Sequence, residues 1–275
     1  MEVTFWGVRG TIPCPSKRHV GYGGNTSCVE VTAGGHTIVL DAGTGVRTLG
    51  GSLMKRGVRK GALLFTHTHW DHIHGFPFFA PAYDKRCDFR ILAGHLSDTA
   101  GGIRGVLGAQ MAGPTFPIPL ETMSARLECE DFRSGDHFQL ARGLHVKTAA
   151  LNHPNGATGY RIEFGGKAVC YVTDTEHVLN RPDQNVLGLI EGADLVIYDS
   201  TYTDEELPAH VGWGHSTWQE GIRLSRAAKV RRLAIFHHEP NHDDTFMGRV
   251  AKEAKAEWKG AFVAREGTTM HVGKD

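Results

Sequence analysis

The segment of residues 66–75, with the sequence THTHWDHIHG, constrains the fold of this chain more than any other stretch. It follows the apolar run of residues 63–65, which is typical of a buried strand. Four side chains of metal-ligating type lie within six positions: His67, His69, Asp71 and His72. In extended backbone, imidazoles two residues apart point the same way. This concentration of nitrogen and oxygen donors at a strand end predicts a site for one or two transition-metal ions rather than a solvated polar loop.

The spacing HxHxDH resembles the metallo-β-lactamase superfamily of metal-dependent hydrolases. The resemblance implies three further ligands downstream, each at a strand end: a lone histidine, a bridging aspartate and a final histidine. The chain supplies them in this order as His153, Asp174 and His237. Successive side chains of a strand face opposite ways, so only one of His237 and His238 can easily point into the cleft, and the motif match selects His237.

The apolar runs predict an α/β chain in which each half has strands first and helices later, so that two β-sheets pack face to face with helices outside. The resemblance implies the same four-layer αββα sandwich, with the metals at one edge between the sheets. No linker divides the chain, so we expect a single domain over residues 1–275. Strands are expected at residues 3–6, 27–31, 37–40, 63–65, 89–92, 138–140, 144–151, 159–164, 168–172, 195–198, 233–236 and 262–272, and helices at residues 217–228 and 246–258 and in a short segment that ends at residue 54.

Residues 95–126 differ from the rest because they combine prolines and glycines with apolar side chains of exposed appearance, namely Met111, Phe116, Ile118 and Met123. We interpret this segment as a partly helical insertion rather than as strands. Its part at residues 105–123 is expected to form a mobile wall or lid over the cleft. Packing against a second subunit of a homodimer is an equally good account of the same apolar residues.

The resemblance also implies how the ligands divide between two divalent metal ions. His67, His69 and His153 would hold one ion, and Asp71, His72 and His237 the other, with Asp174 as the bridge. Two such cations can share a bridging hydroxide, which Asp71 could orient, and clamp the attacking and leaving oxygens. Zinc is the expected metal, and manganese or iron would accept the same ligands. Asp41 is expected to support a metal-bound histidine from behind, with a structural turn as the alternative.

Ligand types narrow the branch of the superfamily. The bridging residue is Asp174 rather than cysteine, and histidine follows Asp71, as in phosphodiesterase, thioesterase and lactonase branches. The sequence GHST at residues 214–217 before a helix resembles the tRNase Z and PhnP-like phosphodiesterases. The resemblance implies that His215 contacts phosphate or protonates the leaving oxygen, with Asp199 as its acidic partner. The alternative is that His215 is a surface histidine and that Asp199 is a turn residue at the end of a strand. Arg9, Asn25 and Thr26 either line the site or shape turns.

The composition of the chain limits the kinds of molecule that it is expected to bind. The 30 basic and 30 acidic residues balance, so the chain has no broad basic field for nucleic acid, and we expect a small substrate. Five scattered cysteines without a CxxC pair suit free thiols in a reducing cytoplasm. The sequence has neither a secretory signal pattern nor an apolar run of membrane length, so we expect a cytoplasmic protein without membrane association.

These observations predict a dinuclear metal-dependent phosphodiesterase that acts on a small phosphodiester, for example a cyclic nucleotide. Hydrolysis of a carboxylic ester, lactone or thioester at the same site is the alternative. An RNA-processing nuclease is disfavoured by the balanced charge. A non-hydrolytic di-iron protein is disfavoured because no flavodoxin-like domain follows.

Overall fold

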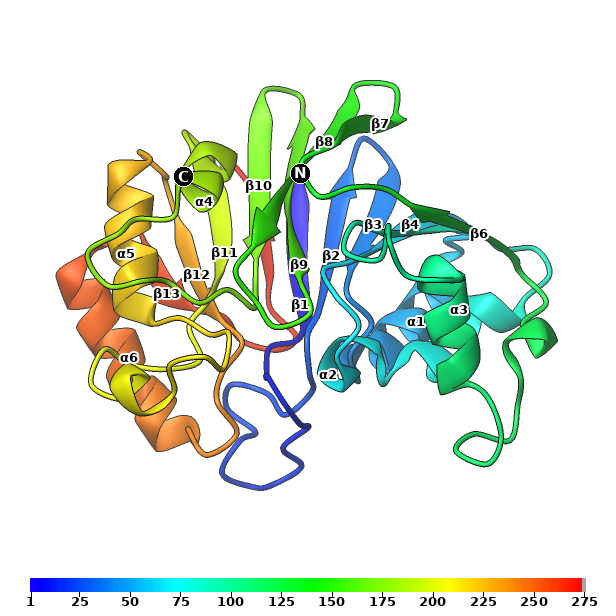
Figure 1. Ribbon diagram of the computed structural model, residues 1–275, viewed down its shortest axis with the longest axis horizontal. Coiled ribbons are helices and arrows are strands. Elements are labelled where there is room, and N and C mark those ends of the chain that lie inside the picture. Colours follow the sequence, from blue (N-terminus) through cyan, green and yellow to red (C-terminus); the bar gives the residue numbers. More distant parts are fainter. Residues whose placement is uncertain (274–275) are drawn as a thin grey trace.

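The computed structural model describes residues 1–273 and contains two seven-stranded β-sheets (Figure 1). The strands of the first sheet are, in spatial order, β14 (Thr269–His271), β1 (Glu2–Gly7), β2 (Cys28–Ala33), β3 (His36–Leu40), β4 (Lys60–Phe65), β5 (Asp88–Ala93) and β6 (Arg126–Asp131). Those of the second sheet are β13 (Ala261–Val263), β12 (Leu233–Phe236), β11 (Leu195–Asp199), β10 (Lys167–Val172), β9 (Ala157–Phe164), β8 (Leu144–Leu151) and β7 (His137–Ala141).

Each sheet is mixed, with an antiparallel part and a parallel part. In the first sheet, β3 to β6 run parallel, and in the second sheet β10 to β13 run parallel. The inner strands β3, β4, β10, β11 and β12 are mostly apolar and buried, as expected for strands that are covered on both faces, whereas the edge strand β6 is polar and partly exposed. Because parallel strands end at the same edge, the residues that follow β3, β4, β10, β11 and β12 gather along one edge of the sandwich.

The core between the sheets is formed by inward-facing side chains of both, such as Val31, Leu64, Ile162 and Tyr171, all fully or almost fully buried. Helices cover the outer faces, so the layers follow the order αββα that the sequence predicts (Figure 1). The helices on the first sheet are α1 (Gly45–Arg56), α2 (Trp70–Ile73) and α3 (Gly102–Gln110), and those on the second sheet are α4 (Gln184–Ile190), α5 (Trp218–Ala227) and α6 (Asp244–Glu257). None of the helices in residues 1–273 has the length and apolar character needed to span a membrane.

The structure differs from the sequence-based expectation in several elements. The single closing strand expected at residues 262–272 is wrong, because β13 and β14 are two short strands that pair with different sheets. Among the strands and α-helices of residues 1–273, β6, α2 and α4 were not expected. Residues 95–126 hold α3 and the 3-10 turn Leu120–Thr122, and Met111 and Met123 are buried rather than exposed. Of the four apolar residues singled out there, Ile118 is exposed and Phe116 is half-buried.

Candidate metal centre

The predicted ligands lie at the strand ends on the edge where the parallel strands terminate. His67 to His72 follow β4 and enter α2, while His153, Asp174 and His237 follow β8, β10 and β12. Asp174 and His237 have positive φ values of 57° and 62°. Non-glycine residues seldom adopt this left-handed conformation, which costs free energy and is concentrated at functional sites. Here it turns the chain sharply after the strand and directs each side chain between the sheets.

The first donor group joins His67, His69 and His153, whose ligand atoms lie within 4.8 Å of one another. The Nδ1 hydrogen of His153 is donated to the backbone oxygen of Gly214 at 2.8 Å. Because a carbonyl can only accept, the lone pair of His153 lies on Nε2, which faces His69 Nδ1 at 3.1 Å. Burial lowers the pKa of His67 well below its usual range, so this imidazole is neutral and competent as a ligand.

The second donor group joins Asp71, His72, Asp174 and His237, all buried and again with ligand atoms within 4.8 Å. Nε2 of His72 lies 3.3 Å from the Asp71 carboxylate and 3.3 Å from His237 Nε2. Nε2 of His237 lies 3.1 Å from Asp71 Oδ2. The structure therefore brings together all seven side chains that the sequence singled out, in the two groups expected.

Asp174 stands between the two groups. Its Oδ2 lies 3.6 Å from Nε2 of both His67 and His153. Its Oδ1 lies 3.1 Å from His72 Nε2 and 3.2 Å from His237 Nε2. One carboxylate oxygen thus faces each histidine set, which is the arrangement that a bridging ligand requires.

The buried carboxylates of this region favour bound cations, because no lysine or arginine among residues 1–273 forms an ion pair with them. Every ion-pair partner of Asp41, Asp71, Asp174 and Asp199 within residues 1–273 is a histidine. Buried carboxylates are costly unless they are paired with positive charge or coordinate a metal. In addition, Nε2 of His67 is buried and has no hydrogen-bond partner among the residues that the structure describes. An imidazole nitrogen of this kind, facing carboxylates and other imidazoles, fits a divalent metal ion. These buried histidine and aspartate groups are consistent with a dinuclear metal site.

Asp41 contacts the second group from behind, as the sequence suggested. It follows β3, has a φ of 59° and accepts the Nδ1 hydrogen of His72 at 2.8 Å. The same carboxylate accepts from the Thr66 backbone N–H at 2.7 Å and from the Tyr171 hydroxyl at 3.0 Å. Because Asp41 can only accept, it leaves the lone pair of His72 on Nε2, which faces the other donors.

His215 and Asp199 form a pair beside the second donor group. His215 lies three residues before the start of α5 at Trp218, and its Nδ1 lies 3.0 Å from Asp199 Oδ2. Burial alone would lower the pKa of His215, but Asp199, and then Asp174 and Asp71, raise it to about 9. These two residues also form a third group of ligand atoms with Asp174 and His237. Within that group, however, the ligand atoms of His215 and Asp199 already form a hydrogen bond with each other.

Two contacts of the site were not foreseen. The Thr201 hydroxyl donates to Asp199 at 2.8 Å and lies 3.0 Å from His237 Nδ1, so it connects the pair to the second donor group. Its position two residues after Asp199 in the sequence YDST was the available signal. The backbone N–H of Thr11 donates to Asp71 Oδ2 at 2.7 Å, and no sequence pattern indicates such a contact.

The N-terminal loop approaches the site through its backbone. A Cβ at Gly10 would lie 2.2 Å from the His237 ring, so only glycine fits there. Arg9 is buried and donates to the backbone oxygens of Gly23, Glu239 and His242. Asn25 donates to Glu266, and the Thr26 hydroxyl accepts from the backbone of Thr44. These contacts favour the structural alternative for Arg9, Asn25 and Thr26.

Polar residues after His237 also have structural partners. His238 is buried, and its Nε2 donates to the backbone oxygen of Ala264 at 2.9 Å, away from the donor groups. His242 contacts Glu206 at 2.8 Å, and Asp243 caps the N-terminus of α6. Asp244 accepts from the backbone of Gly21 and Tyr22. These polar residues therefore have structural contacts, and the choice of His237 over His238 agrees with the geometry.

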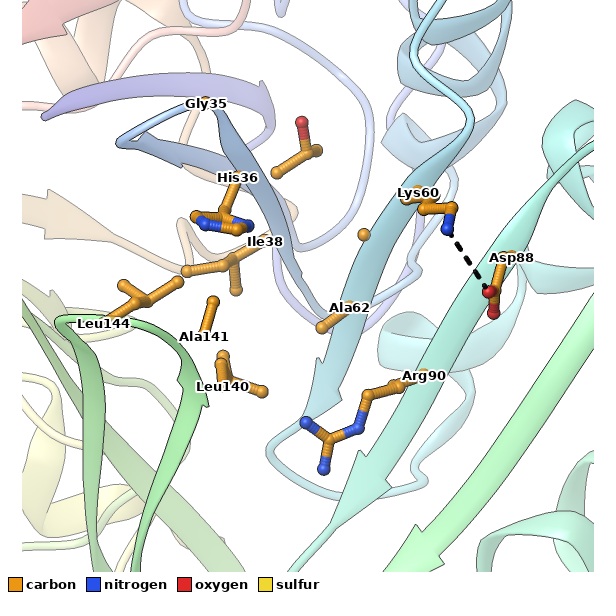
Figure 2. Close-up of a pocket in the computed structure, with 12 residues that line it drawn as sticks. Gly35, His36, Ile38, Lys60, Ala62, Asp88, Arg90, Leu140, Ala141 and Leu144 are labelled. Carbon is orange, nitrogen blue, oxygen red and sulfur yellow. Dashed lines mark ion pairs between the residues drawn. The ribbon is translucent and has the colours of Figure 1, made fainter.

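A hollow of about 410 Å³ lies at the opposite ends of the strands (Figure 2). It is bounded by the starts of β4 and β5 and by the β7–β8 hairpin, with Ile38, Ala62 and Leu140 among its apolar lining residues. At its rim, Lys60 and Asp88 pair at 4.0 Å. The donor groups lie beyond the other ends of β4 and β5, so the chemistry of the molecule is not located in this hollow.

An αββα sandwich with paired histidine and aspartate groups at its strand ends defines the metallo-β-lactamase fold. The chain belongs to the corresponding superfamily, since the family model described as "Beta-lactamase superfamily domain" matches residues 36–238. Ribonuclease Z of Haloarcula marismortui is 26% identical over 282 residues, which cover 86% of each chain. The crystal structure of human tRNase Z, short form, has a TM-score of 0.72 at 19% identity and covers 100% of both chains. A diphosphatase of the PhnP family has a TM-score of 0.70 at 17% identity, with 98% of this chain and 97% of that chain covered.

Proposed function

We propose that this protein is a dinuclear metal-dependent phosphodiesterase whose substrate is a small phosphodiester such as a cyclic nucleotide. The observation that carries the proposal is the His215–Asp199 pair, 3.0 Å apart and directly beside the second donor group. A pair of this kind holds a proton next to the reacting centre, where hydrolysis of a phosphodiester needs one for its leaving alkoxide.

The residues have distinct roles in this proposal. His67, His69 and His153 would hold one ion, Asp71, His72 and His237 the other, and Asp174 would bridge them. Zinc suits these ligands best, and manganese or iron would also be accepted. When bound, the ions would activate water and withdraw negative charge from the phosphoryl oxygens.

Contacts behind the ligands support this division of the seven side chains between two ions. Asp41 and the Gly214 carbonyl fix the orientation of His72 and His153. His215 donates its Nδ1 hydrogen to Asp199, which sets the direction in which its Nε2 points. As the general acid, His215 would deliver a proton from Nε2 to the leaving oxygen. Asp199 would be a positioning residue that favours the protonated imidazole.

Two classes of phosphodiester, RNA and a small diester, are candidate substrates. The name ribonuclease Z of the relative makes an RNA phosphodiester a plausible substrate class. The net charge of zero favours a small diester, because proteins that hold long polyanions usually carry a basic surface. Assays of the purified protein should therefore include cyclic nucleotides, an RNA oligonucleotide, a lactone and a thioester.

Metal analysis of wild type and Asp174→Ala tests the centre itself. Wild type should carry about two metals per chain, and the variant should lose at least one of them together with nearly all hydrolysis, because both oxygens of the bridge are removed. The fold of the variant is checked by circular dichroism. Metal-free wild type, or full activity of Asp174→Ala, would contradict the dinuclear centre. Robust lactone or thioester hydrolysis without phosphodiester hydrolysis would replace the proposal with an acyl hydrolase.

A further inference from the structure

Trp213 is an exposed tryptophan in the loop that carries His215. Its relative exposure is 60%, although tryptophan is highly buried on average in folded proteins. Only Gly214 separates it from His215 in the sequence. An exposed aromatic side chain this close to a reactive centre suggests a contact with substrate rather than a packing role.

The backbone on both sides of Trp213 is held in place. One oxygen of Glu176 accepts from the N–H groups of Gly212 at 2.7 Å and Gly214 at 2.8 Å. A Cβ at Gly214 would lie 2.3 Å from His153 Nδ1, and the φ of 84° also favours glycine. Since the Gly214 carbonyl accepts from His153, the loop is fixed directly to the first donor group. The exposed ring is thus presented from an ordered backbone.

A row of aromatic rings connects Trp213 with the centre. The Trp213 ring meets His210 edge to face with centroids 5.1 Å apart, and His210 stacks on Tyr202 at 4.1 Å and 15°. Tyr202 in turn lies 6.1 Å from His215, which stacks on His237 at 5.0 Å. Tyr202 is buried. His210 Nδ1 donates its hydrogen to the backbone oxygen of Glu206 at 2.9 Å. The row therefore runs from the second donor group to the protein surface.

We propose that the exposed ring of Trp213 forms a stacking platform for the nucleobase attached to the scissile phosphodiester, with His210 supporting that ring edge to face. This inference rests on the proposed phosphodiesterase function and specifies its substrate as a nucleotide. With the phosphoryl group at the donor groups and His215 at the leaving oxygen, the base of a nucleotide would reach the exposed Trp213 ring, whereas the buried Tyr202 only links His210 with His215 by ring packing. Aromatic side chains bind bases through their π-faces with little sequence preference, so any base would be accepted. A substrate with an aliphatic group at this position would gain much less from planar rings.

Binding of the metal-loaded protein to AMP and to ribose 5-phosphate, measured by calorimetry, tests the platform without turnover. Wild type should bind AMP more tightly than ribose 5-phosphate. Trp213→Ala should weaken AMP binding about 5- to 100-fold and leave ribose 5-phosphate binding unchanged, because only the base contact is lost. Trp213→Phe should retain most of the preference. Val211→Ala is the matched control, since Val211 is an exposed apolar residue of the same loop with a relative exposure of 68%.

Equal binding of AMP and ribose 5-phosphate by wild type would overturn the platform, and so would an equal loss for both ligands in Trp213→Ala. A comparable loss of AMP binding in Val211→Ala would overturn it as well, because the effect would then belong to the loop as a whole. Phosphodiester hydrolysis is measured separately on wild type. Its failure would refute the proposed function, whereas loss of the AMP preference alone would refute only the platform.

Discussion

His215 allows the sharpest test of the chemistry at the scale of single residues. An alkoxide leaving group needs a proton in the transition state, whereas nitrophenolate leaves readily without one. His215→Ala should therefore lower kcat for an alkyl-leaving or cyclic diester by about 10²–10⁴-fold. It should lower kcat for a nitrophenyl diester much less.

Metal content of His215→Ala serves as the control for this experiment, and both ions should remain. Equal losses on the two substrates would show that His215 contacts phosphate rather than donating a proton. Loss of a metal ion would assign His215 to the third ligand group, together with Asp199.

His95 should make the folded state sensitive to acid. Burial, and then the nearby His69 and His72, lower the pKa of His95 from 6.5 to about 4. As pH falls below 6.5, the unfolded chain binds a proton here that the folded chain does not, so stability declines down to about pH 4. His95→Gln should remove this contribution, at most about 1.4 kcal/mol for each pH unit.

Urea unfolding of wild type and His95→Gln at pH 7.5 and pH 5.5 measures that contribution. The difference in unfolding free energy between the two pH values should be smaller in the variant. The comparison between proteins cancels acid effects on the other histidines. An identical pH dependence in both would contradict the assignment to His95.

Local sequence chemistry predicted the four donors of the short motif, and the family resemblance implied the other three. Those three each follow an apolar strand. The supporting contacts were harder to predict, because they depend on backbone atoms and on distant loops. Thr11 acts through its N–H, and Glu176 binds two backbone amides more than 30 residues away. Neither contact leaves a pattern in residue type.

At the scale of elements, most strands and the longer helices α5 and α6 were predicted, whereas β6 and several short elements were not. The helix α2 has four residues, and β13 and β14 have three each, too few for an amphipathic pattern to appear. For α4, the N-cap Asp183, which accepts from the backbone of Asn185 and Val186, was the available signal. The insertion is anchored by α3, since Gln110 donates to the backbone oxygen of Ile73 in α2 at 2.8 Å. Its function as a lid or subunit contact stays a prediction.

The loop of residues 210–214 is the element whose rigidity is most open to test. Glu176→Ala would remove the acceptor of two backbone amides and release the Gly214 carbonyl that orients His153. Loss of such an orienting contact typically lowers metal affinity about 10- to 100-fold. Metal competition titrations of the variant should show this loss for one of the two ions.

Glu205→Ala is the matched control, because Glu205 is an exposed carboxylate in a neighbouring loop. Its metal affinity should equal that of wild type. Unchanged affinity in Glu176→Ala would show that the His153 orientation does not depend on this loop, and the platform around Trp213 would lose one of its supports.

At the scale of the whole molecule, the donor groups connect the two sheets. His67, His69, Asp71 and His72 follow a strand of the first sheet, whereas His153, Asp174 and His237 follow strands of the second. Neither sheet alone could supply both groups. We therefore propose that the chain folds and functions as a single domain, in which the residues of the insertion pack on α2 and the first sheet.

Metal removal should consequently loosen the whole sandwich rather than one loop. Ions bound only by the folded state stabilise it by RT ln(1 + [L]/Kd), about 4 kcal/mol at a thousandfold excess over Kd. Removal by a chelator should lower the Tm by on the order of 10 °C in a scanning calorimeter. Without the ions, the buried Asp71 and Asp174 would keep only histidines as ion-pair partners among residues 1–273, which adds to the loss. Asp174→Ala, which lacks the bridge, should start from a lower Tm and respond less to the chelator. If the Tm of wild type were the same with and without chelator, the histidine and aspartate groups would not hold tightly bound ions, and the inference of a dinuclear centre would fail.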